Sequence, residues 1–130
     1  MNDFDISDIE ARVKTIVRDE LGVSKTVFNN RPKSADITEN DFCVVRVTGT
    51  VEDKAAYGEC RIAISLFAKD VNNQKNGKKL SVMYKKLVAG LPYEDNRYLF
   101  DDTPTIVGDT ADDYGYHARI IQMHTIIKIS

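Results

Sequence analysis

Residues 42–70 read FCVVRVTGTVEDKAAYGECRIAISLFAKD, and this stretch decides the fold. Its second half alternates with a period of two, and one side carries only small or apolar residues, namely Cys60, Ile62, Ile64, Leu66 and Ala68. Alternation of this length is typical of a half-buried β-strand, here about Glu59–Asp70. The preceding run, Phe42–Val51, predicts its antiparallel partner, and the polar residues around Lys54–Tyr57 predict the turn of a hairpin.

An amphipathic helix is predicted before the hairpin, over Ser7–Leu21. Ser7 and Glu10 have the spacing of a capping box, and Ile6 precedes them as a hydrophobic staple. Gly22 is expected just beyond the last helical residue. The apolar stripe of this helix comprises Ile9, Val13, Ile16, Val17 and Leu21. We expect this stripe to cover one face of a sheet.

Between this helix and the hairpin, Val23–Phe28 is expected as a short extended segment and Asn29–Asp41 as an exposed loop. A second helix is predicted over Lys78–Ala89, ended by Gly90 and Pro92. Its inward residues are expected to be Leu80, Met83, Tyr84, Leu87 and Val88.

The C-terminal part is expected to be β again. Arg97–Gly108 predicts a strand that bends near Asp101–Pro104, and Asp109–Asp113 predicts an acidic turn. Tyr114–Ile129 predicts a long strand, with Ile121, Met123, Ile127 and Ile129 on one side. The predicted order α-β-β-α-β-β indicates an α+β fold, in which two helices pack on a mainly antiparallel sheet. With 130 residues, we expect positions 1–130 to form a single domain.

Composition excludes several classes of protein. No apolar run approaches the roughly 18 residues of a membrane span, and the acidic start MNDFDISDIE does not resemble a secretory signal. A soluble, intracellular protein is therefore expected. Cys43 and Cys60 fall at opposite ends of the predicted hairpin, about 20 Å apart, beyond the reach of a disulfide. No Cys/His spacing indicates zinc, and no motif indicates a cofactor.

Catalytic signatures are weak throughout the chain. Glu52-Asp53-Lys54 has the E-x-K spacing of metal-dependent nucleases, but the predicted hairpin tip favours a solvated turn. His117 and His124 lie seven residues apart on one predicted strand and therefore point to opposite faces. One of them can still form an acid–base couple with Asp101 or Asp102.

Charge is unevenly distributed. Residues 69–86 hold six lysines and one acid, whereas residues 94–113 hold seven acids and one base. These segments are either two solvated faces or the two sides of a head-to-tail contact between copies, which closes into rings or extends into tubes. The candidate subunit-interface residues are Lys78, Lys79, Lys85, Lys86, Asp101, Asp102, Asp109, Asp112 and Asp113. The lysine cluster has one aromatic residue, Tyr84, which is expected to face inward, so no platform for nucleic-acid bases is predicted.

The element order resembles that of a known family. A capped helix, the hairpin above, the helical segment KKLSVMYKKLVAGLPY and the closing strand YGYHARIIQMHTIIKIS together resemble the tail terminator, or tail completion, proteins of long-tailed bacteriophages and the related neck proteins. The resemblance covers most of the chain and rests on hydrophobic pattern. It implies a structural protein, without enzymatic activity, that assembles into a hexameric ring where the tail joins the head connector.

The expected function is thus phage or prophage tail assembly through ring formation. The expected partners are further copies of the chain and other tail or head-connector proteins, with no membrane and no sequence-specific nucleic acid. The expected location is the cytoplasm of the bacterial host or the virion. Two alternatives remain open: a small enzyme that uses Asp101, Asp102 or His117, and an adaptor module that adds a peptide strand to a sheet edge.

Overall fold

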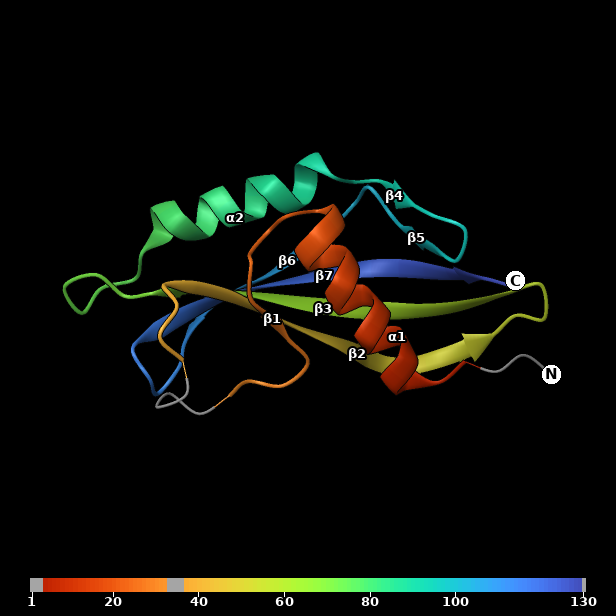
Figure 1. Ribbon diagram of the computed structural model, residues 1–130, viewed down its shortest axis with the longest axis horizontal. Helices are drawn as coiled ribbons and strands as arrows, with labels where there is room; N and C mark the ends of the chain where they lie inside the picture. The colour runs from red at the N-terminus through yellow and green to blue at the C-terminus, as the bar shows by residue number, and fades with distance from the viewer. Residues whose placement is uncertain (1–3, 33–36, 130) are drawn as a thin grey trace.

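The computed structural model describes residues 4–32 and 37–129. Within them the fold is α+β, with two α-helices and a curled sheet of seven strands (Figure 1). The elements are α1 Ile6–Thr15, the π-helix η1 Ile16–Glu20, β1 Val27–Phe28, β2 Asp41–Asp53, β3 Tyr57–Lys69, α2 Gly77–Ala89, β4 Tyr93–Glu94, β5 Tyr98–Phe100, β6 Thr105–Ala111 and β7 Tyr116–Lys128.

The sheet is built around three long strands. Its order is β1-β2-β3-β7-β5-β4, and β6 pairs with β7 beyond β5 along the same edge. All strand pairs are antiparallel except β1–β2, which is parallel. The predicted hairpin is confirmed, with Val45 opposite Ile64. The predicted element order is too simple. The short strands β1 and β4 also belong to the sheet, where they pair with β2 and β5 respectively, and the Arg97–Gly108 segment divides into β5 and β6 around residues 101–104.

Both helices cover the same face of the sheet, and the main core lies between them. Figure 1 shows α1 crossing the strands obliquely, while α2 runs along the upper edge of the view. The alternating side chains of β3 and β7 meet the helix stripes in one buried cluster that includes Val13, Ile16, Ile62, Leu66, Leu80, Met83, Ile121 and Met123. The inward stripe of α2 is narrower than predicted, since the Val88 side chain is exposed.

The start of α1 differs from the prediction. The N-cap residue is Asp5, whose side chain accepts a hydrogen bond from the backbone nitrogen of Asp8 at 3.2 Å. Ser7 is therefore already helical, and no capping box forms with Glu10. The end agrees better, because Gly22 has a φ of 64°, the left-handed conformation that a residue just after a helix adopts and that glycine tolerates best.

The opposite face carries a second, smaller cluster. Phe42, Phe67 and Tyr116 from β2, β3 and β7 pack together there, with Ile37 buried against them. Part of the segment predicted as an exposed loop thus covers aromatic rings; residues 33–36 lie outside the described part. The guanidinium carbon of Arg31 lies 4.9–5.3 Å from the centroids of four rings, those of Phe42, Phe67, Tyr114 and Tyr116.

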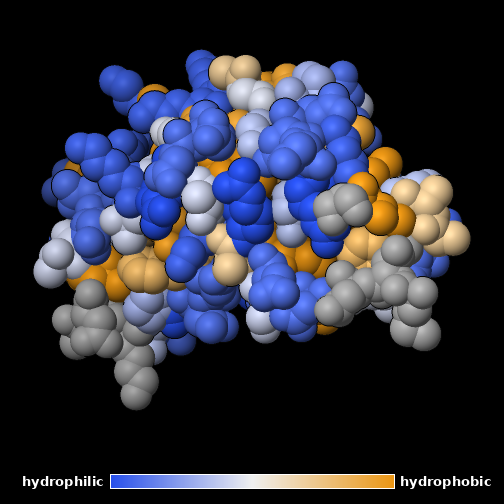
Figure 2. All heavy atoms as spheres, turned by 45° about the vertical axis from the view of Figure 1, so that its right-hand side comes forward, coloured by the Kyte–Doolittle hydropathy of each residue, from blue (hydrophilic) through white to orange (hydrophobic). Residues whose placement is uncertain are grey.

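On the face shown in Figure 2, hydrophilic residues predominate and hydrophobic ones appear in small areas between them. Neither helix in the described ranges combines the length and the apolar character that crossing a membrane requires.

Candidate functional site

Several of the charges predicted for an interface are neutralised within the chain. Asp109 lies on β6 rather than in a turn, and its two carboxylate oxygens accept hydrogen bonds from Arg119 at 2.8 and 2.9 Å. The Lys75 amine lies 3.1 Å from the same carboxylate. The hydrogen bonds from Arg119 lower the pKa of Asp109 to about 2, so this carboxylate is ionised at neutral pH. Asp109 therefore joins β6 to β7, and its carboxylate is already paired within the chain.

Two further candidate residues also have intramolecular partners. The Asp112 carboxylate lies 2.8 Å from Arg31, in an ion pair whose two side chains are both mostly buried. The Lys79 amine lies 3.0 Å from Asp41, which also accepts a hydrogen bond from Ser24 at 2.6 Å. Asp112 and Lys79 are thus also paired within the chain.

The remaining candidates form no ion pair with any residue in the described ranges. They are Lys78, Lys85 and Lys86 on α2, and Asp101, Asp102 and Asp113. Burial raises the pKa of Asp41, but hydrogen bonds from Ser24 and Lys79, with a smaller contribution from the nearby charge of Lys86, lower it below its ordinary value. Lys78 and Lys85 are the cations most available to a partner.

These two lysines belong to one outward stripe of α2. Positions 78, 82, 85 and 89 follow helical spacing on the side opposite the buried Leu80, Met83 and Leu87. All four outward residues are exposed, and we call Lys78, Val82, Lys85 and Ala89 the lysine stripe.

The helices cover one face of the sheet, and the other face is hollowed beside His124 of β7. We call this the open face; within the described residues no helix packs on it. The cause is a bulge in β2. Thr48 lies opposite Arg61 and Glu52 opposite Glu59, so three residues of β2, at positions 49–51, correspond to the single residue Cys60 on β3. Gly49 has a φ of 72°, which suits glycine. The bulge borders a hollow of about 390 Å³.

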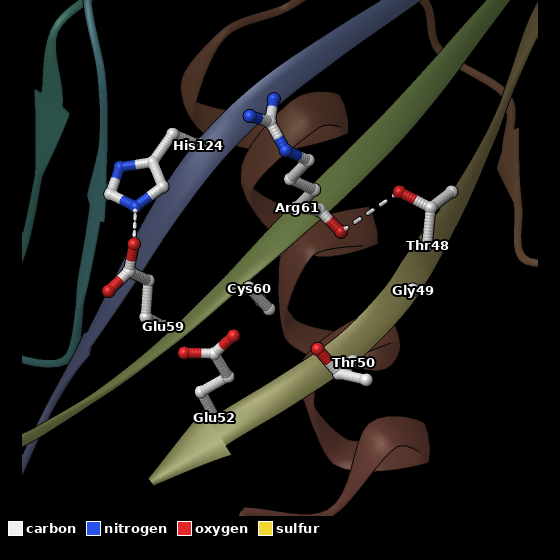
Figure 3. Close-up of a pocket in the computed structure, with 8 residues that line it drawn as sticks. All are labelled: Thr48, Gly49, Thr50, Glu52, Glu59, Cys60, Arg61 and His124. Carbon is white, nitrogen blue, oxygen red and sulfur yellow. Dashed lines mark hydrogen bonds and ion pairs between the residues drawn. The ribbon is translucent and has the colours of Figure 1, made fainter. Parts of the chain in front are cut away.

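This first hollow, the bulge hollow, contains an acid–imidazole pair. Nε2 of His124 lies 2.5 Å from a carboxylate oxygen of Glu59, and Figure 3 shows the two side chains pointing toward each other. The Glu52 carboxylate and the exposed Arg61 also line the hollow. The other ring nitrogen of His124, Nδ1, points away from Glu59 (Figure 3). His124 is thereby oriented by Glu59 and keeps one nitrogen for a further contact.

A second hollow, of about 330 Å³, lies on the other side of His124. We call it the acidic hollow: its acids are Asp101 and Asp102, and its apolar walls are Pro92, Leu99 and Ile126. Hydrogen bonds from Thr103 and Asp102 lower the pKa of Asp101, which favours the ionised carboxylate. This combination of an apolar wall and two carboxylates suits a cation that has an aliphatic stem.

The structure thus brings Asp101 and Asp102 together with His124, not with His117. Nδ1 of His117 lies 2.6 Å from a carboxylate oxygen of Asp70, and His117 does not line the acidic hollow. Sequence reasoning missed the Glu59–His124 pair. The signal that would have found it is the β3–β7 register, in which Arg61 lies opposite His124, and Glu59, two residues along β3 on the same face, lies diagonally across from it.

Thiol chemistry has little support at this site. Cys60 borders the bulge hollow, but burial raises the pKa of its thiol to about 11. Cys43 is buried too, and burial raises the pKa of its thiol further. Both thiols are therefore protonated at neutral pH and weakly nucleophilic. Among the described residues, no cluster of three or more His, Cys, Asp or Glu side chains is arranged to hold a metal ion.

The edge of the sheet at β6 offers a different kind of surface. Among the described strands, β6 pairs only with β7, so its second edge is unpaired. Ile106 and Val107 on this strand are about half exposed, at 48% and 56%. An edge of this kind can add a strand from another chain.

The chain matches no protein-family model, and no curated protein is detectably similar to it in sequence.

Proposed function

We propose that this chain is a structural, non-catalytic assembly protein of a phage or prophage tail, of the tail terminator, tail completion or neck type. It acts by joining copies head to tail into a ring, and it meets other tail or head-connector proteins, in the bacterial cytoplasm or in the virion. The family resemblance of the element order motivates the assignment to tails.

The observation that carries the proposal is the placement of the charges that have no ion pair among the described residues. The lysine stripe points away from the sheet on the helix-covered side, whereas Asp101 and Asp102 lie in a hollow of the open face. Complementary patches on opposite sides of one molecule favour heterologous contacts, and heterologous contacts close into rings when their rotation permits.

The site chemistry supports a non-catalytic role. A general acid needs a carboxyl whose pKa is raised toward neutrality, and the pKa of Asp101 is lowered instead. The available nucleophile, the Cys60 thiol, is protonated at neutral pH.

Size-exclusion chromatography with light scattering, at low and at moderate salt, tests the oligomer. The expected result is a mass that is a whole-number multiple of the 14.7 kDa chain, together with rings in negative-stain electron microscopy. Because the proposed contact is electrostatic, the assembly should weaken as salt rises. A monomer at low salt and the highest attainable concentration would overturn the proposal.

The assignment to tails has its own test. Deleting the gene from a prophage that carries it should leave heads and tails unjoined, or tails of irregular length, in electron micrographs of induced particles. Normal, infectious particles from the deletion strain would contradict the assignment.

The unpaired edge of β6 favours one second candidate function, the binding of an extended peptide as an additional strand. Replacing Val107 with proline removes a backbone donor on this exposed edge strand. Peptide-array binding that the Val107→Pro variant loses, in a protein that stays monomeric, would favour the adaptor over the ring protein.

A further inference from the structure

We propose that the acidic hollow receives the lysine stripe of the next copy of this chain. The inference rests on the proposed head-to-tail assembly and names its contact: α2 of one subunit lies against the open face of its neighbour. Lys85 or Lys78 enters the hollow, and its amine meets Asp101 and Asp102.

The shape and chemistry of the hollow match a lysine side chain. Leu99 and Ile126 form an apolar wall along which four methylene groups can pack, and the two carboxylates lie beside that wall. Asp101 and Asp102 have no ion pair among the described residues, so an incoming amine displaces no internal partner.

The donor side is equally specific. Lys79 is held by Asp41, and Lys75 by Asp109, whereas Lys78 and Lys85 have no ion pair in the described part of the chain. Between them on the stripe lies Val82, whose side chain is 40% exposed. A surface that alternates lysine and valine is suited to a hollow that combines acids with apolar walls.

The spacing of the two lysines provides a second argument. Lys78 and Lys85 are two helical turns apart, about 10 Å along the axis. On the open face, Glu59 and Leu99 both lie opposite Ile126, on β3 and β5 respectively. Two strand separations place them about 10 Å apart. One lysine can therefore reach the acidic hollow while the other lies over the bulge hollow, whose carboxylates Glu59 and Glu52 are paired within the chain with His124 and Lys54.

The two surfaces lie on opposite sides of the sheet, and this determines the kind of assembly. The inner residues of α2 are buried against the sheet, so the stripe faces outward, whereas the hollow opens on the far face. A two-fold dimer would need one self-complementary patch. Two different patches instead leave each subunit with one donor side and one acceptor side, the requirement for a ring.

Charge-reversal variants test the contact. Lys78→Glu/Lys85→Glu should raise the concentration for half-assembly by about tenfold or more, because like charges then meet, and Asp101→Lys/Asp102→Lys should do the same. Mixing the two variants should restore assembly, since every contact in an alternating ring again joins opposite charges. Lys25→Glu/Lys69→Glu and Asp8→Lys/Glu20→Lys carry the same charge changes at exposed positions away from the contact and should assemble like the unmodified chain.

Cross-linking gives a readout that does not depend on disrupting the assembly. Asp102→Cys protein, mixed under mild oxidant with Lys85→Cys or with Lys78→Cys protein, should form a disulfide between copies with at least one of the two, whereas Lys69→Cys with Asp102→Cys should not. The native Cys43 and Cys60 are buried and do not compete.

The possible results separate the two proposals. Rings that are indifferent to all the charge reversals and give no cross-link from Asp102 to either Lys85 or Lys78 would overturn this contact and leave the ring itself standing. A strictly monomeric unmodified chain would overturn the ring and this contact together.

Discussion

The carboxylate of Glu10 on α1 accepts a hydrogen bond from the backbone nitrogen of Val47 on β2, at 2.9 Å. The Asn29 side chain donates to two carbonyls beside it, those of Glu10 and Val45, at 3.0 and 3.3 Å. Strand β1 pairs with β2 only at Cys43 and Val44. Glu10 and Asn29 thus satisfy the backbone groups of β2 beyond the end of β1 and protect this edge of the sheet.

Glu10→Ala should therefore destabilise the fold. The Val47 amide loses its partner, and we expect the free energy of unfolding to fall by about 1–2 kcal/mol in urea titrations followed by circular dichroism. Glu10→Gln keeps an accepting oxygen and should recover part of the loss. Ser7→Ala is the matched control and should change stability by less than about 0.5 kcal/mol. Comparable losses from Ser7→Ala and Glu10→Ala would contradict the Asp5 cap and restore the capping box that the sequence predicts.

This helix also shows what local sequence can predict. The apolar stripe of α1 was predictable from its spacing, because burial against a sheet needs only a period of 3.6. The cap was not predictable, because Asp5 with Asp8 and Ser7 with Glu10 are competing signals of similar strength. Which cap forms depends on Val47, because its backbone nitrogen binds the Glu10 carboxylate that a capping box would need. Val47 lies far along the chain, and its position is set by the sheet.

Arg31 fixes the segment after β1 onto the open face. Its guanidinium lies close to four aromatic rings and is paired with Asp112. Arg31→Ala should lower the free energy of unfolding by about 2 kcal/mol, because the cation–π contacts and a mostly buried ion pair are lost together. Arg31→Lys should recover less than half of this loss of stability. An ammonium group cannot stack on aromatic rings as a planar guanidinium does, and it cannot donate two parallel hydrogen bonds to one carboxylate.

Intrinsic tyrosine fluorescence during urea unfolding provides the measurement for Arg31. Arg46→Ala is the control, because Arg46 is an exposed arginine of the same face. Equal losses from Arg31→Ala and Arg46→Ala would mean that the rings contribute nothing to the role of Arg31.

The candidate site was less predictable than the fold. Asp101 and Asp102 were identified from sequence, with His117 or His124 as their possible partner, but the sequence did not say which of the two, because the bend between β5 and β6 decides which histidine they meet. Similarly, acids in a polar segment suggest a solvated turn, and only the pairing of β6 with β7 brings Asp109 to Arg119. Side-chain partners across a sheet depend on register, which local pattern alone specifies only in part.

Thr125 is a fully buried polar residue whose hydroxyl has no hydrogen-bond partner among the described residues. It lies on β7 between Cys60 of β3 and Phe100 of β5. Thr125→Val replaces the hydroxyl with a methyl group and should raise the free energy of unfolding by about 1 kcal/mol, since an unsatisfied buried group is removed. Thr125→Ser keeps the hydroxyl and removes the methyl group, so it should destabilise the core by about 1 kcal/mol. Urea titrations of both variants decide the matter, and a destabilised valine variant would show that the hydroxyl has a partner.

The ion pair of Asp109 with Arg119 predicts a specific dependence of stability on pH. Arg119 holds the pKa of Asp109 at about 2, below its ordinary value of 3.8. Because the pKa is lower in the folded chain than in the unfolded chain, the ionised carboxylate stabilises the fold above about pH 4, and this contribution is lost as pH falls toward 2. A difference of nearly two pKa units corresponds to about 2 kcal/mol.

Asp109→Asn should therefore lower the free energy of unfolding by about 2 kcal/mol at neutral pH, and by much less near pH 2, where the aspartate is about half protonated in the folded chain and almost fully protonated in the unfolded chain. Lys75→Ala should have a small effect at either pH, because the Lys75 side chain is 45% exposed and its ion pair is screened by water. Urea unfolding at the two pH values gives the comparison. If Asp109→Asn cost the same at both, the loss would come from packing or from the neutral hydrogen bonds, and the charge on Asp109 would not be what joins β6 to β7.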